Sequence, residues 1–177
     1  STCATSLGVS ASDAVPIKVS TISDSLHLLT GRGGNIVVMS GKDGVFMVDD
    51  QYATQVPEIQ KALKSINVAT PKFLFNTHWH ADHSGGNEAF GTAGAIVFSH
   101  ANVRKRMSSE QFMAFFKRAT PASPEKAWPI LTFTDELSLY VNNEEIEIVH
   151  APNAHTDGDS IVSVSYTHLR AHETPIN

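Results

Sequence analysis

The chain has 177 residues, of which 41% are hydrophobic and 18% are charged, and this composition is typical of a folded globular domain. Its formal net charge of −5 argues against a basic surface, so we expect no nucleic-acid partner. No apolar run approaches the ~18 residues of a membrane span, and the single cysteine, Cys3, excludes an internal disulfide framework.

Residues 1–14 are small and mostly polar and form a leader before the first predicted strand. Small side chains around Ala11 and Ala14 suit a signal-peptide cleavage site, although the basic and apolar parts of a signal are not in the sequence. We interpret the segment as a signal-peptide remnant or a disordered leader. The first interpretation implies a periplasmic or secreted protein, and the second is compatible with the cytoplasm.

Short strands are predicted from Ile17 onwards, in runs separated by glycine-rich or Asp-Gly turns: Ser25–Gly31, Asn35–Gly41 and Gly44–Asp50. A helix is predicted within residues 54–67, because apolar side chains recur there at helical spacing. Another strand, Pro71–Thr77, leads into a short helix bounded by glycines.

The remaining predicted elements are a strand at Ala95–His100, a helix from Ala101 towards Arg118, a surface loop at Thr120–Pro129, and a hairpin of Leu137–Val141 and Glu144–Val149 with Asn142-Asn143 as its turn. Strands followed by strand–helix–strand units predict an α/β sandwich, with a mixed sheet and helices on its outer face.

The stretch FNTHWHADHSGGN, residues 75–87, places four metal-binding side chains directly after a predicted buried strand. In extended backbone, His78 and His80 lie on the same side and can meet one cation. Asp82 and His83 follow a turn and can serve a second position. Two metals roughly 3.5–4 Å apart can share a bridging hydroxide and clamp a scissile bond.

Two histidines do not complete a tetrahedral zinc site, so a third ligand must come from elsewhere in the chain. The candidate is His155 in the predicted loop APNAHTDGDS, and the fourth position would hold the water nucleophile. We interpret His27, His100 and His150 as ordinary surface histidines.

The segments THWHADH and AHTDGD together resemble the metallo-β-lactamase superfamily, and the resemblance extends over about Val15 to Val162. It implies an αββα sandwich, of which this chain holds the N-terminal half and the start of the second half. It also implies that His78, His80 and His155 hold the first zinc ion and that Asp82 and His83 contribute to the second.

The resemblance assigns the catalytic role to Asp82, which would orient or deprotonate the bridging water. Asp49, Asp50 and Asp159 match positions that support the metal loops, and a solvated strand end or turn is the alternative for them. Zinc is the expected metal, with iron or manganese as alternatives.

The function implied is a hydrolase that uses a zinc-activated water or hydroxide to cleave an ester, lactone, thioester or lactam-like bond in a small-molecule substrate. A non-enzymatic metal-binding half-domain and an iron-dependent oxygenase of the same fold are the alternatives. The aromatic residues of the segment Met107–Pro129 are better explained by packing than as a wall over the site: Phe112, Phe115, Phe116 and Trp128.

The end of the chain departs from the family pattern, because the expected bridging Asp and final His have no counterpart. VSYTHLRAHET, residues 164–174, matches an in-frame translation of a transposase-type sequencing adapter. We therefore expect a partial domain at 15–163 and a non-native tail at 164–177, although His168 and His172 are conceivable replacement ligands. A fragment of this kind is expected to be inactive and to self-associate through an exposed sheet face.

Overall fold

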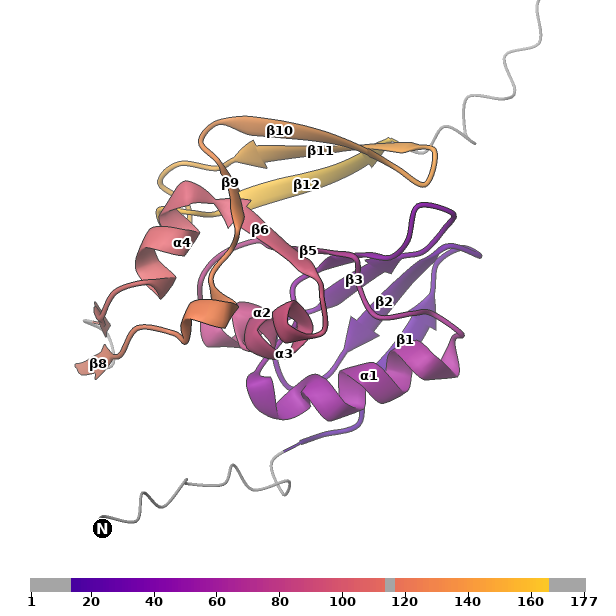
Figure 1. Cartoon of the computed structure of the whole chain (residues 1–177), viewed down its shortest axis with the longest axis horizontal. Coiled ribbons are helices and arrows are strands. Elements are labelled where there is room, and N and C mark those ends of the chain that lie inside the picture. The colour runs from indigo at the N-terminus through magenta and orange to yellow at the C-terminus, as the bar shows by residue number, and fades with distance from the viewer. Residues whose placement is uncertain (1–13, 114–116, 166–177) are drawn as a thin grey trace, which may run out of the picture.

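A seven-stranded mixed sheet forms the centre of the computed structural model, which describes residues 14–113 and 117–165 (Figure 1). Its strand order is β1-β2-β3-β4-β5-β6-β9. Neighbouring strands are antiparallel from β1 to β4 and parallel from β4 to β9. The strands are β1 (Lys18–Thr21), β2 (Leu26–Thr30), β3 (Ile36–Met39), β4 (Phe46–Val48), β5 (Phe73–Asn76), β6 (Ile96–His100) and β9 (Leu131–Phe133).

Helices cover one face of this sheet (Figure 1). The apolar stripe of α1, which includes Ile59 and Leu63, packs on strand residues such as Met47 and Leu74 in one buried cluster. The helical elements are η2 (Ala53–Gln55), α1 (Val56–Ser65), α2 (Ala81–Ser84), α3 (Asn87–Thr92), α4 (Ala101–Met107) and η3 (Glu125–Ala127). None of the helices in the described part of the chain is long and apolar enough to cross a membrane.

A second, antiparallel sheet of β10 (Glu136–Val141), β11 (Glu144–His150) and β12 (Ser160–Ser165) covers the opposite face (Figure 1). Ile146 and Ile148 on its inner face pack against Phe75 and Phe98 of the large sheet. The β10–β11 turn is Asn142-Asn143 with both φ angles positive, as the sequence predicts. The α/β sandwich is therefore confirmed, and its described part has one helical layer and two stacked sheets.

The outer face of the second sheet is exposed and partly apolar. Tyr140, Val149 and Ile161 are 76%, 48% and 66% exposed, and Val149 and Ile161 are neighbours across the β11–β12 ladder. Within residues 14–113 and 117–165, no helix covers this face. Strand β12 extends to Ser165, three residues beyond Val162, where the resemblance to the superfamily was expected to end. Its last residues still pair with β11, as far as Glu145.

The long helix predicted from Ala101 towards Arg118 is wrong, because α4 ends at Met107. The hydroxyls of Ser108 and Ser109 both donate to the Lys105 carbonyl, and such side-chain bonds compete with helix continuation. The chain then forms a two-stranded hairpin of β7 (Gln111–Met113) and β8 (Arg118–Thr120).

Two further expectations need correction. The predicted loop Thr120–Pro129 contains η3, and it packs inward rather than passing freely over the surface, because Ala127 is buried beside α4. The supposed surface histidines His27 and His100 are 6% and 4% exposed. Of the aromatic residues that we expected to be explained by packing, Trp128 does pack on α4, but Phe112 is 71% exposed and does not; Phe115 and Phe116 lie outside the described residues.

Candidate metal centre

The histidine cluster begins where β5 leaves the sheet. Phe75 and Asn76 are fully buried, and they hold this end of the strand between β4 and β6. His80 keeps an extended backbone (φ −66°, ψ 146°) as the N-cap of α2, so His78 and His80 precede the helix and Asp82 and His83 lie within it. The change from strand to helix therefore separates the two pairs, as the sequence predicts.

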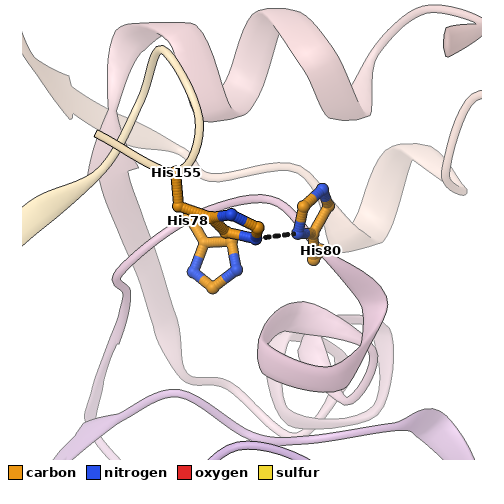
Figure 2. Close-up of side chains that lie close together, drawn as sticks. All are labelled: His78, His80 and His155. Carbon is orange, nitrogen blue, oxygen red and sulfur yellow. Dashed lines mark hydrogen bonds between the residues drawn. The ribbon is translucent and has the colours of Figure 1, made fainter. Parts of the chain in front are cut away.

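His155 reaches His78 and His80 from the loop between β11 and β12. One ring nitrogen from each of the three histidines lies within 4.8 Å of the other two. The closest pair is His155 Nε2 and His80 Nδ1, at 3.0 Å, and the ring centroids of His78 and His155 are 5.3 Å apart. Figure 2 shows the three rings converging from two segments that are 75 positions apart in the chain.

Asp49 organises the ring nitrogens that face away from the cluster. Its Oδ1 accepts the Thr77 backbone N–H, and its Oδ2 accepts the Thr77 hydroxyl and His83 Nδ1 at 2.8 and 2.7 Å. Since the Thr77 hydroxyl gives its proton to Asp49, it accepts from His78 Nδ1 at 3.1 Å. In their neutral forms, His78 and His83 would therefore both keep an Nε2 lone pair for another partner.

Asp82 and His83 form a second, less enclosed group. His83 Nε2 lies 3.5 Å from Asp82 Oδ2, and the Asp82 side chain is 38% exposed. The glycine loop between β2 and β3 approaches closely: Gly34 N–H donates to the Asp82 carbonyl, and a Cβ on Gly34 would lie 2.2 Å from His83 Cε1. Only glycine leaves space for the His83 ring here.

Burial and mutual repulsion keep the first pair of histidines neutral. Burial, reinforced by the neighbouring His83 and His80 rings, lowers the pKa of His78 to about 4. Burial and His155 also lower the pKa of His80. For His83, burial acts to lower the pKa, but the hydrogen bond and charge of Asp49 outweigh it and raise the pKa. Burial raises the pKa of Asp49 itself.

Asp159 shapes the loop that carries His155. Its carboxylate accepts the backbone N–H groups of His155 and Thr156 at 2.7 and 3.0 Å and the Thr156 hydroxyl at 2.5 Å. These bonds outweigh the effect of partial burial and hold the Asp159 pKa below its ordinary value. The first residue of β12, Ser160, then donates its N–H to the Thr77 carbonyl, which joins the two sheets beside the cluster.

Asp50 binds the end of the motif and the glycines that follow it, because its N–H donates to the His83 carbonyl. It is fully buried, its Oδ1 accepts the Gly86 N–H at 2.8 Å, and burial raises its pKa well above the ordinary value. Its Oδ2 has no hydrogen-bond partner within the described ranges. Asp49 and Asp50 are therefore not a solvated strand end, which was the alternative interpretation of this pair.

The donor set fits a zinc ion. Three imidazole nitrogens with one open position are a common catalytic zinc arrangement, and two nitrogens bound to one tetrahedral zinc lie about 3.3 Å apart. The separation of 3.0 Å between His80 and His155 needs only a small widening, and the His78 nitrogen, within 4.8 Å of both, needs to move closer to them. Across the described residues, this triad is the only group of three or more His, Cys, Asp or Glu donors with such spacing, so no third donor joins Asp82 and His83.

Several contacts around the site were not predicted from the sequence. Thr77 carries the hydrogen-bond link between Asp49 and His78, and buried Asn87 donates to Asn76 Oδ1 at 2.8 Å beneath the loop. Gly34 belongs to a glycine run that the sequence marks only as a turn. Its contact with His83 joins two segments that share no motif, so nothing in the local sequence indicates this contact.

The family model of the metallo-beta-lactamase superfamily matches residues 29–170, a stretch that includes the histidine cluster and His155. The chain belongs to this superfamily. The match covers most of the chain, and the sandwich and the position of the cluster at the strand ends agree with it.

Solved metallo-beta-lactamase structures share the fold at low sequence identity. A metallo-beta-lactamase from Cronobacter sakazakii with a HARLDQ motif matches 85% of this chain with a TM-score of 0.74 and 18% identity. BJP-1, a subclass B3 metallo-beta-lactamase of Bradyrhizobium japonicum, matches 85% of this chain with a TM-score of 0.74 and 16% identity. MEM-A1, a subclass B3 metallo-beta-lactamase from a soil metagenome library, matches 84% of this chain with a TM-score of 0.66 and 18% identity. The chain spans 59%, 58% and 62% of their lengths, respectively.

Proposed function

We propose that this chain is part of a metal-dependent hydrolase that cleaves an ester, lactone, thioester or lactam-like bond in a small molecule. The observation that carries the proposal is the convergence of His78, His80 and His155 from two distant segments on one point. Burial keeps the first two rings neutral, which is the form that binds a metal ion.

Zinc is the metal that best suits three imidazoles, and His78, His80 and His155 would hold it. When bound, zinc lowers the pKa of a coordinated water towards neutrality and so supplies a hydroxide nucleophile at ordinary pH. The residues of the chain supply the rest. Asp49 fixes the orientation of His78 and His83, and Asp159 holds the backbone of His155.

Asp82 is the proposed proton acceptor of the site. Its carboxylate stands beside His83 and is open to solvent, so it can exchange protons while remaining close to the cluster. With His83 it would also form part of a second metal position. Only these two donors serve that position within the described residues, so we expect weak binding there and little turnover by this chain alone.

Metal analysis with matched variants tests the proposal. Purified chain should retain zinc close to one equivalent, and His78→Ala should abolish this binding. His27→Gln, which changes a histidine of β2 that contacts Thr21, should leave the metal content unchanged. Equal zinc content in all three proteins would contradict the proposed site.

The reaction class is tested on the protein translated from the full open reading frame. That protein should hydrolyse at least one class in a panel of lactams, lactones, thioesters and phosphoesters, and a chelator should remove the activity. Retained iron with oxygen-dependent activity would favour the oxygenase. Metal binding without turnover of any class would favour the non-enzymatic domain.

A further inference from the structure

Asp157 connects the His155 loop to α4 through its side chain and its backbone. The guanidinium of Arg106 donates to both carboxylate oxygens, with Nε–Oδ1 at 3.2 Å and Nη2–Oδ2 at 3.0 Å. The Asp157 carbonyl accepts Asn102 Nδ2 at 2.7 Å and His150 Nε2 at 3.1 Å. Four hydrogen bonds thus converge on the residue two positions after the third histidine.

The next residue brings the loop into direct contact with the helix. A Cβ on Gly158 would lie 2.9 Å from Val103 Cγ2 and 3.1 Å from the Val103 backbone nitrogen. The absence of a side chain at Gly158 therefore permits the close approach that the hydrogen bonds of Asp157 require. Loop and helix meet over one turn of α4, from Asn102 to Arg106.

The same helix also contacts the segment that carries the other two histidines. Val103 and Met107 of α4 form a buried cluster with Ala127, and Trp79 packs against this cluster. Trp79 lies between His78 and His80 in sequence. One face of α4 thus supports the β5 loop through Trp79, and another part of it fixes the β11–β12 loop through Asp157.

The β11–β12 loop is built to transmit such a restraint. The Ala151 N–H donates to the Asp159 carbonyl and closes the loop at its base. Inside it, Asp159 binds the backbone of His155 and Thr156, as described above. A loop braced in this way is restrained as a unit, so its attachment at Asp157 is one of the contacts that place the His155 ring.

On the basis of the metal site proposed above, we propose that α4 sets the distance between His155 and the His78–His80 pair, with Arg106 as the positioning residue. The ion pair is exposed, each side chain being 43% accessible, so it contributes little to overall stability. Its effect falls instead on the alignment of the third ligand, where a small displacement weakens metal binding.

Cobalt(II) titration of the whole chain tests this inference, because the visible absorption bands of bound cobalt report ligand number and geometry. Arg106→Ala should weaken cobalt affinity about three- to tenfold and alter the bands, a loss between that of an exposed ion pair and that of a ligand-supporting residue. Arg106→Lys should restore part of the affinity. Lys105→Ala, which removes an exposed charge from the same helix, should match the unchanged chain.

The Asp157→Asn variant tests the same ion pair from the other side and leaves the backbone contacts of Asp157 in place. It should reproduce the loss seen in Arg106→Ala, and the double variant should be no weaker than either single variant, because both changes break one link. The far-UV circular dichroism of all variants should be unchanged. In 1 M salt, the difference between the unchanged chain and Arg106→Ala should shrink.

Cobalt affinity and bands that are the same in Arg106→Ala and the unchanged chain would overturn the inference while leaving the metal site intact. Additive losses in the double variant would also overturn it. If the unchanged chain bound no cobalt, the proposed function itself would fail, and the positioning role would fail with it.

Discussion

The two candidate metal positions lie side by side, but they are built differently. His78, His80 and His155 come from two loops on two sheets, and hydrogen bonds from Thr77 and Asp159 brace them from outside. Asp82 and His83 come from one turn of α2, and the described residues add no third donor. The first position is thus closed by tertiary structure, whereas the second depends on a local motif.

This difference shows why a motif and a site are not equivalent. Adjacent residues in a chain can approach an ion from only one side, whereas a tetrahedral ion needs donors around it. The packing of the second sheet on the first brings His155 to the open side of His78 and His80. Variants that disrupt one position at a time should therefore lose metal affinity by unequal amounts.

The largest loss is expected from His155→Ala. It removes the only one of the three histidines that lies beside the second sheet, so zinc affinity should fall more than about a hundredfold, beyond the usual cost of changing a supporting residue. Competition with a coloured chelator measures the change. An affinity within a fewfold of the unchanged chain would show that His155 is not a ligand.

Asp49→Asn should affect both positions. Asparagine tolerates the positive φ of 62° at this residue, but it loses the charge that accepts from Thr77 and His83. Because the orientation of His78 and His83 depends on these bonds, metal affinity should fall roughly 10- to 100-fold. The exposed residue Asp24 provides the control, and Asp24→Asn should leave the metal affinity unchanged. A similar metal affinity in Asp49→Asn and Asp24→Asn would show that Asp49 does not support the metal positions.

Gly34→Ala should affect only the second position. The added methyl group overlaps His83 and must displace its ring, because the three atoms nearest to a Cβ on Gly34 all belong to His83. Overpacking of this kind costs about 1–3 kcal/mol, which corresponds to roughly a tenfold loss or more in binding of a second zinc equivalent. Isothermal titration should show unchanged affinity for the first equivalent. A loss at the first equivalent instead would contradict the separation of the two positions.

The smallest effect is expected from pH in the presence of a chelator. The pKa of His78 is lowered from 6.5 to about 4, so the unfolded chain takes up this proton first as the pH falls. The free energy of unfolding should therefore decrease between pH 6.5 and about 4, by on the order of 1 kcal/mol. Urea unfolding of the chain and of His78→Gln measures it. As the pH falls, the unfolding free energy of the variant should decline less steeply than that of the unchanged chain. Equal slopes for the two proteins would show that the pKa of His78 is not lowered.

The first position was predictable from the sequence because its chemistry is concentrated in recognisable patterns. Alternate spacing placed His78 and His80 together, the need for a third ligand pointed to the His155 loop, and the resemblance to the superfamily supported that choice. Most strands of both sheets followed from apolar runs and turn residues, but β9 and β12 were not predicted. The end of α4 was missed, because the side-chain bonds of Ser108 and Ser109 that stop the helix carry no periodic signal.

The supporting contacts could not be predicted, because they join segments that are distant in sequence. Asp49 and His83 are 34 positions apart, and Arg106 and Asp157 are 51 apart. Each residue is ordinary in its own segment, and only the packing of two loops and a helix gives it a partner. The expected non-native tail at 164–177 stays a prediction that the encoding DNA can test.

Zinc stoichiometry is the most direct test of the contrast between the two positions. Titration of the metal-free chain, followed by elemental analysis after gel filtration, should give one tightly held zinc ion that His155→Ala eliminates. A second equivalent should bind weakly and be lost on the column. Two tightly held ions per chain, or one ion that persists in His155→Ala, would contradict the account.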